Sequence, residues 1–138
     1  MFYEVSIKFD QVQETGLVKK VTEKIIFLVE TFGEAEAKAM EYISPYCNGE
    51  YDIVAIRRQE IAQVFRSNEE AADRWYKAKI VFTCLDERTG KEKRTQQTVM
   101  VLAKDFDDAR NILQNGMAGS LGDWEKAVVA ETPITAIV

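Results

Sequence analysis

The sequence has no histidine, and this absence removes several classes of enzyme from consideration. Ser-His-Asp catalysis, Cys-His catalysis and imidazole metal sites all need that side chain, so only carboxylates, lysines, tyrosines and thiols remain for acid–base chemistry. The two cysteines, Cys47 and Cys84, are too few for a disulfide framework and form no CxxC pair. Nothing around them indicates a reactive thiol. We therefore expect no catalytic residue, no cofactor and no metal site, and we expect that the protein is not an enzyme.

Long hydrophobic runs and positive charge are also scarce. No apolar run approaches the roughly 20 residues that span a membrane, and the N-terminus has no basic stretch followed by an apolar one. The 18 Lys and Arg against 23 Asp and Glu give a net charge of −5, which opposes binding to nucleic acid or anionic lipid. The 138 residues, of which 46% are hydrophobic and only two are proline, are typical of one globular domain. We expect a cytoplasmic protein with reduced thiols that does not bind membranes.

The most informative feature that is present is an internal repeat. The stretch FYEVSIKF, which begins at Phe2, matches WYKAKIVF, which begins at Trp75. Further matches follow in the same order: Thr15-Gly16 with Thr89-Gly90, Lys19-Lys20 with Lys93-Arg94, Phe32 with Phe106, and Ala35 with Ala109. Ordered matches indicate a duplicated unit. We predict one domain made of two repeats, 1–58 and 75–131, joined by a connector over 59–74 and followed by a tail over 132–138.

Each repeat predicts two strands, a helix and a third strand. In residues 3–9 and 76–82 apolar side chains alternate with polar ones, as in a strand buried on one face. A polar Thr-Gly turn and a second strand, ending near Val29 in one repeat and Ala103 in the other, complete a hairpin. These patterns predict an antiparallel pair at the start of each repeat.

The two predicted helices begin with the same signal. Thr31 and Asp105 are suitable N-cap residues, and an acid, Glu34 or Asp108, follows three positions later. Clustered carboxylates around Asp107 suit a divalent cation, but the parallel with the first repeat favours a helix cap. The apolar stripes of the two helices are Ala35, Ala39, Tyr42 and Ile43, and Ala109, Ile112, Leu113 and Gly116. Such stripes predict helices packed on one face of a sheet.

The third strands are predicted over 51–57 and 124–130, after turns at Gly49 and Gly122. Both are apolar on two faces in the middle, which favours a place inside a sheet over a place at its edge. The fold class is therefore α+β: a tandem β-β-α-β unit, mainly antiparallel sheet and helices on one face. The pattern leaves open whether the repeats share one sheet or form two facing sheets.

The connector carries its own helix signal. Ser67 and Glu70 have the spacing of a capping box, which predicts a short helix over 69–74. Ile61, Val64 and Phe65 indicate that the preceding segment packs against the body of the protein.

Five segments spread over essentially the whole chain also carry a family resemblance. They are FYEVSIKF, GLVKKVTE, TFGEAEA, SPYCNGEYDIVAIRR and EEAADRWYKAKIVF, of which EAADRWYKAKIVF is the most specific. Together they resemble an uncharacterised family of small bacterial and phage proteins of unknown function. The resemblance therefore transfers no catalytic or binding residue. It implies an origin in a mobile element or phage of gut-type anaerobic bacteria.

Four apolar residues are candidates for a partner surface. Ile26 and Leu28 alternate with core positions of their strand and so face outward, and Met100 and Leu102 occupy the matching places in the second repeat. We call these four residues the outer apolar set. Either a partner covers them, or the connector and the tail do.

Four cations are candidates for an anionic-ligand surface. Lys19 and Lys20 lie in the first hairpin, and Lys93 and Arg94 lie in the second, near aromatic residues that are able to stack on bases. Acidic neighbours dilute both clusters, so solvated hairpins with cross-strand charge pairs are the simpler interpretation.

These observations predict a non-enzymatic interaction protein. It self-associates or binds a protein partner through sheet edges or the outer apolar set. The alternative is a binder of a small anionic ligand or single-stranded nucleic acid through the two basic hairpins, and its affinity would fall steeply with salt.

Overall fold

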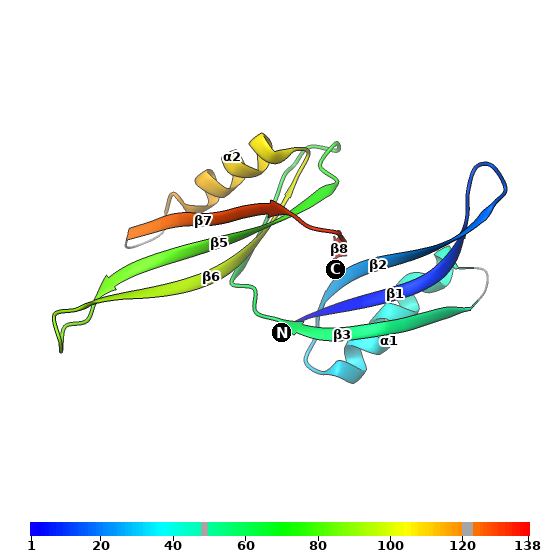
Figure 1. Ribbon diagram of the computed structural model, residues 1–138, viewed down its shortest axis with the longest axis horizontal. Coiled ribbons are helices and arrows are strands. Elements are labelled where there is room, and N and C mark those ends of the chain that lie inside the picture. The colour runs from blue at the N-terminus through cyan, green and yellow to red at the C-terminus, as the bar shows by residue number, and fades with distance from the viewer. Residues whose placement is uncertain (48–49, 120–122) are drawn as a thin grey trace. The chain divides into compact units, whose positions relative to one another are not determined.

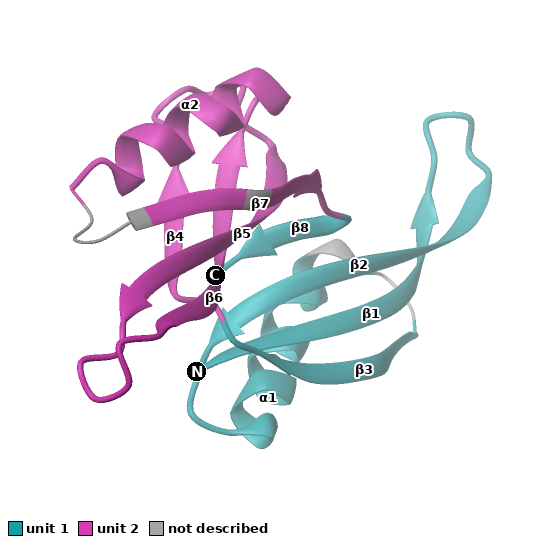
Figure 2. Ribbon diagram, turned by 60° about the vertical axis from the view of Figure 1, so that its left-hand side comes forward, with its two compact units in different colours: residues 1–60, 133–138 teal, residues 61–132 magenta. Residues whose placement is uncertain are grey.

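The computed structural model describes residues 1–47, 50–119 and 123–138, and it divides into two compact units (Figures 1 and 2). Unit 1 comprises residues 1–60 and 133–138, and unit 2 comprises residues 61–132. Each unit is a four-stranded sheet with a helix packed on one face. The predicted α+β class is confirmed, and each unit has a sheet of its own. The turns predicted at Gly49 and Gly122 lie outside the described residues.

Unit 1 has four strands, one α-helix and one short 3-10 helix: β1 (Phe2–Val12), β2 (Val18–Leu28), α1 (Phe32–Ile43), η1 (Ser44–Tyr46), β3 (Tyr51–Gln59) and β8 (Ile134–Ile137). The order across its sheet is β3-β1-β2-β8. β1 pairs antiparallel with β2 and β3, whereas β8 pairs parallel with β2.

Unit 2 has the corresponding elements: β4 (Gln63–Arg66), β5 (Arg74–Leu85), β6 (Glu92–Ala103), α2 (Phe106–Met117) and β7 (Asp123–Glu131). The order across its sheet is β4-β6-β5-β7. β5 pairs antiparallel with β6 and β7, whereas β4 pairs parallel with β6. The two units therefore have the same strand order.

The alternation in the sequence explains both cores. In β1, Val5 and Ile7 are fully buried, and the register with β2 places Ile25 and Phe27 on the same side of the sheet, under α1. Burial of each large apolar side chain contributes about 1.5–3 kcal/mol. The small buried residues of the helices, such as Ala39, let the helix approach the sheet closely. No helix in the described part of the chain is long and apolar enough to cross a membrane.

Local signals set the turns and helix starts as predicted. The N–H of Glu34 donates to Thr31 Oγ1 (3.1 Å), and the N–H of Asp108 donates to Asp105 Oδ1 (2.8 Å). The Glu34 and Asp108 carboxylates in turn accept from the N–H that precedes each cap, at 3.1 and 3.2 Å. These paired bonds satisfy donors that a helix start leaves free. At the hairpin tips the glycines have φ of 84° and 68°, a region that L-residues with side chains avoid.

The third strands lie at the edges of their sheets, so the prediction that they lie inside is wrong. The register of β3 with β1 shifts once, because Val54 is an extra residue in the pairing. As a result Ile53 and Ile56 both pack against the core, while Val54 is 60% exposed. The register of β7 with β5 shifts at the matching point. An apolar run that suggested burial on two faces is therefore the pattern of a β-bulge.

The connector forms a strand and a turn, and the helix predicted over 69–74 is wrong. After β4, Ser67 Oγ accepts from the N–H of Glu69 (3.2 Å), and Ala72 donates its N–H to the Glu69 carbonyl (3.1 Å). Arg74 already begins β5. The capping residue therefore starts a turn that does not continue as a helix.

Each sheet takes its fourth strand from the segment that follows the third strand of the other unit (Figure 2). β4 follows β3 in the chain but belongs to unit 2, and β8 follows β7 but belongs to unit 1. Val64 lies opposite Met100, and Ile137 lies opposite Ile26. The predicted connector and tail therefore contain strands that complete the two units.

Candidate functional site

The outer apolar set does not form a free surface. Ile26 and Met100 lie on the sheet face away from the helix, as predicted, but they are only 1% and 2% exposed. Leu102 is half-buried, and Leu28 is 60% exposed. The fourth strand of each sheet runs directly beside this set. Leu28 is therefore the member that a partner can reach.

The predicted cations of unit 1 point in different directions. Lys20 lies opposite Asp10, and Lys19 lies opposite Gln11. Because neighbouring residues of a strand face opposite sides of a sheet, the two lysines do not share a face. The side chains of these two lysines, of Asp10 and of Gln11 are all solvent-exposed. A negative group directly across from Lys20 further reduces the attraction of this hairpin for anions.

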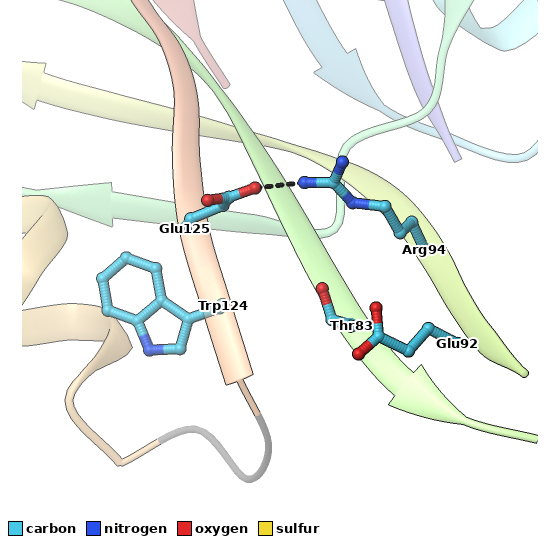
Figure 3. A pocket seen from close by; sticks show the side chains of 5 residues that line it. All are labelled: Thr83, Glu92, Arg94, Trp124 and Glu125. Atoms are coloured by element: carbon cyan, nitrogen blue, oxygen red, sulfur yellow. Dashed lines mark hydrogen bonds and ion pairs between the residues drawn. The ribbon is translucent and has the colours of Figure 1, made fainter.

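The predicted cations of unit 2 also do not form one positive surface. Arg94 on β6 binds Glu125 on β7 by reaching across β5, while Trp124 points to the other side of β7 (Figure 3). These residues belong to a hollow of about 280 Å³ whose lining is Thr83, Glu92, Arg94, Trp124 and Glu125. Two carboxylates and one guanidinium give the hollow a net negative charge. Lys93 lies on the opposite face, since it is adjacent to Arg94 in the strand, so the two cations do not act together.

A second hollow, of about 240 Å³, lies in unit 1. Its lining is Phe9, Gln11, Glu23, Tyr42 and Thr135. Glu23 lies opposite Ile7 in the β1–β2 pair, so its side chain is on the α1 side of the sheet among core residues. It has no hydrogen-bond or ion-pair partner among the residues that the structure describes. Sequence reasoning did not find this group, although the carboxylate breaks the apolar side of the alternation in β2.

Burial raises the pKa of Glu23, and this predicts a measurable effect on stability. The folded state binds more protons than the unfolded state between the ordinary and the raised pKa, so stability falls as pH rises through that window. At neutral pH, Glu23→Gln should increase the free energy of unfolding by up to about 0.5 kcal/mol, a value reduced for solvent screening. Below the ordinary carboxyl pKa the difference should disappear.

Urea unfolding of the two proteins at several pH values checks this expectation. Glu36→Gln, on the exposed side of α1, is the matched control and should change the free energy of unfolding at neutral pH by less than about 0.5 kcal/mol. A Glu23→Gln variant that is less stable than the parent at neutral pH would show that the carboxylate makes a favourable contact that outweighs its desolvation.

The outer edges of β3 and β7 are a further candidate site. Each strand has nine residues and, within the described chain, no strand on its outer side. Val54 is 60% exposed on β3, and Val128 is 48% exposed on β7. An edge strand presents unpaired N–H and C=O groups to any extended segment that approaches it. Both sheets therefore have backbone available for pairing.

The charges on the two edges differ. On β7, Glu125 binds Arg94 and Glu131 binds Arg74 (3.9 Å), both within unit 2. On β3, Arg57 and Arg58 are exposed, and the ion pairs formed by residues 1–47, 50–119 and 123–138 include neither. Arg57 lies opposite Glu4 in the β1–β3 register, whereas Arg58 lies opposite Tyr3, so Arg58 is the cation of this edge that has no acid directly across from it.

The thiols and carboxylate clusters have ordinary structural surroundings. Cys47 donates to the Glu50 carbonyl (3.7 Å), and Cys84 donates to the Lys93 carbonyl (3.5 Å). Asp105 binds the α2 start through its side chain. Among the described residues, no group of three or more cysteine, aspartate and glutamate side chains is arranged to hold a metal ion.

Comparison with known proteins gives a family but no activity. No curated protein and no solved structure matches the chain significantly. A family model described as "Domain of unknown function (DUF4494)" matches residues 1–138, which is the whole chain given. The protein therefore belongs to the DUF4494 family.

Proposed function

We propose that the protein is a non-enzymatic interaction protein that binds an extended segment of a protein partner along the free edge of β3. The observation that carries this proposal is the nine-residue edge strand with no neighbour on its outer side. The outer apolar set offers little free surface, since Ile26 and Met100 are buried. In the basic hairpins Asp10 lies opposite Lys20 and Glu125 binds Arg94, and the two cations of each hairpin are on opposite faces of the sheet. The sheet edge is therefore the best-supported of the predicted partner surfaces.

Strand addition explains how such an edge binds. Backbone hydrogen bonds to the partner supply affinity, at about 0.5–1.5 kcal/mol net for each bond, and alternate side chains supply specificity. The exposed Val54 offers apolar contact at the bulge. The bulge itself limits pairing to segments that accommodate its twist, which protects the edge against indiscriminate aggregation.

The charges favour β3 over β7 and favour an acidic partner. Arg58 is exposed near the C-terminal end of β3 and lies opposite Tyr3, while Glu125 and Glu131 of β7 are already bound to arginines of unit 2. An acidic segment gains electrostatic complementarity along β3. A cytoplasmic setting and a bacterial or phage origin belong to the same proposal, and they name the cells in which to look for the partner.

Val54→Glu should abolish partner binding while leaving the fold intact. The side chain is 60% exposed, so the change should alter the free energy of unfolding by less than about 1 kcal/mol, yet it places a negative charge where an acidic strand would pair. Native mass spectrometry of the protein purified gently from its host would show the partner on the parent and its loss from the variant. Hydrogen exchange should show protection gained by β3 amides in the complex.

Val128→Glu is the matched control, because it makes the same change at the edge of β7 and should leave binding intact. A partner that stays bound to the Val54→Glu variant, or protection that appears on elements other than β3, would contradict the proposal.

A further inference from the structure

The hollow of unit 1 is held by regular secondary structure on every side. Phe9 and Gln11 come from β1, Glu23 from β2, Tyr42 from α1 and Thr135 from β8. Phe9 is 3% exposed and belongs to the hydrophobic core. Tyr42 is half-buried and meets Phe27 edge-on, with ring centroids 6.1 Å apart. The positions of the two rings, Phe9 and Tyr42, are therefore fixed by packing before any ligand arrives, which lowers the entropic cost of binding.

The hollow places one negative charge against aromatic rings. Because Glu23 is half-buried, the charge of its carboxylate is only partly solvated. The carboxylate has no hydrogen-bond or ion-pair partner among the described residues. A buried or half-buried charge is usually matched by a partner of opposite sign. The faces of aromatic rings also attract cations, and quaternary ammonium groups are commonly bound in this way. The hollow therefore has the chemistry of a site for a positively charged organic group.

The corresponding place in unit 2 has neither the carboxylate nor the helix tyrosine. Gln97 takes the place of Glu23, because it lies opposite Ile80 as Glu23 lies opposite Ile7. On the helix, Gly116 takes the place of Tyr42, and the Phe65 ring of β4 packs against this glycine instead. The charge and the helix tyrosine thus occur together in unit 1 and not in the described part of unit 2. General core packing of this fold does not require them.

The size of the hollow limits the ligand. At about 240 Å³ it is below the usual range for drug-sized ligands, so it suits a compact group and excludes a peptide. Gln11 and Thr135 add an amide and a hydroxyl at the rim, which are able to bind a polar substituent of the ligand.

We propose that this hollow binds a small organic ammonium compound, with Glu23 as its counter-ion and the rings of Tyr42 and Phe9 as its apolar walls. The site is separate from the β3 edge, because none of its residues belongs to β3. No covalent step is involved. Binding replaces water around the carboxylate by a cation that also contacts the rings.

The test uses the full chain with choline and its neutral analogue of the same shape, 3,3-dimethylbutan-1-ol, followed by NMR chemical-shift titration. Choline should bind at least about tenfold more tightly than the alcohol, which corresponds to about 1.4 kcal/mol. The largest shift changes should lie at Glu23 and Tyr42. Equal affinity for the two probes, or no saturable shift with choline at these residues, would overturn the proposal.

Substitutions separate a built site from general electrostatics. Glu23→Gln should remove the preference for choline, Tyr42→Phe should keep most of it, and Tyr42→Leu should weaken choline binding severalfold. The double variant Glu23→Gln with Gln97→Glu has the net charge of the parent, but it places the carboxylate in unit 2, where the helix has Gly116 in place of the tyrosine and the Phe65 ring packs against that glycine. Like Glu23→Gln alone, this double variant should bind choline no more tightly than the neutral alcohol. If it bound choline more tightly, the site assignment would be wrong.

Discussion

Ile137→Ala should destabilise unit 1, which is built mainly from the opposite end of the sequence. Ile137 is 6% exposed on β8 and lies opposite Ile26, which is 1% exposed. Loss of a buried isoleucine side chain typically costs about 2–4 kcal/mol. Because β8 pairs only with β2 in the described chain, the loss should fall on the sheet of β1, β2 and β3.

Hydrogen exchange followed by mass spectrometry would locate the effect. The free energy of opening for amides of β1 and β2 should fall by as much as the free energy of unfolding, and the decrease should be smaller for amides of β5 and β6. Val138→Ala is the matched control, since Val138 is 58% exposed and its replacement should change stability by less than about 0.5 kcal/mol. If Ile137→Ala opened β7, which directly precedes β8 in the sequence, together with its sheet partner β5, the strand exchange between the units would be wrong.

The features that the sequence predicted correctly depend on residues close together in the chain. Alternation defines the hairpin strands, glycines with positive φ close the turns, and an acceptor followed by an acid three residues later starts each helix. Each signal acts through contacts within a few positions, so it is visible without the tertiary structure.

The features that were missed depend on pairing between distant segments. Val54 forms a bulge because the register between β3 and β1 shifts there and leaves Val54 without a partner residue. The sequence does not show this shift, so the apolar run around Val54 resembles an inner strand. The fourth strands are four residues long, which is too short for a clear alternation. A signal did exist, because Ile61-Ala-Gln-Val-Phe65 matches Ile134-Thr-Ala-Ile-Val138 at the offset of the repeat. The two segments occupy equivalent places beside β6 and β2.

In the candidate sites, too, the features that were missed depend on contacts between residues far apart in the sequence. Counting cations located the exposed hairpins, but the compensation of Arg94 depends on Glu125, which lies two strands away in the sheet. The hollow of unit 1 combines residues from four elements, so spacing along the chain does not reveal it. Its one local sign is Glu23, a carboxylate on the core side of β2 between Val21 and Ile25.

Gly116→Ala should destabilise unit 2, although alanine is normally the better residue in a helix. Without a steric conflict the change would stabilise a helix interior by about 0.5–1 kcal/mol. A Cβ at Gly116 would lie 2.7 Å from Phe65 Cζ, with two more ring carbons at 2.8 and 2.9 Å. The ring packs against the core of unit 2, so it cannot move aside without losing buried contacts. Overpacking of this kind costs about 1–3 kcal/mol, which exceeds the helix gain.

A double-mutant cycle measured by urea unfolding identifies Phe65 as the cause. Phe65→Ala alone should cost about 2–4 kcal/mol, since it removes a ring packed on the core. In that background Gly116→Ala should become stabilising by about 0.5–1 kcal/mol, because the conflicting ring is gone. Gln114→Ala, at an exposed position of the same helix, should be nearly neutral in both backgrounds. Gly116→Ala that stabilises the parent protein would place Phe65 away from α2, and β4 would then not complete unit 2.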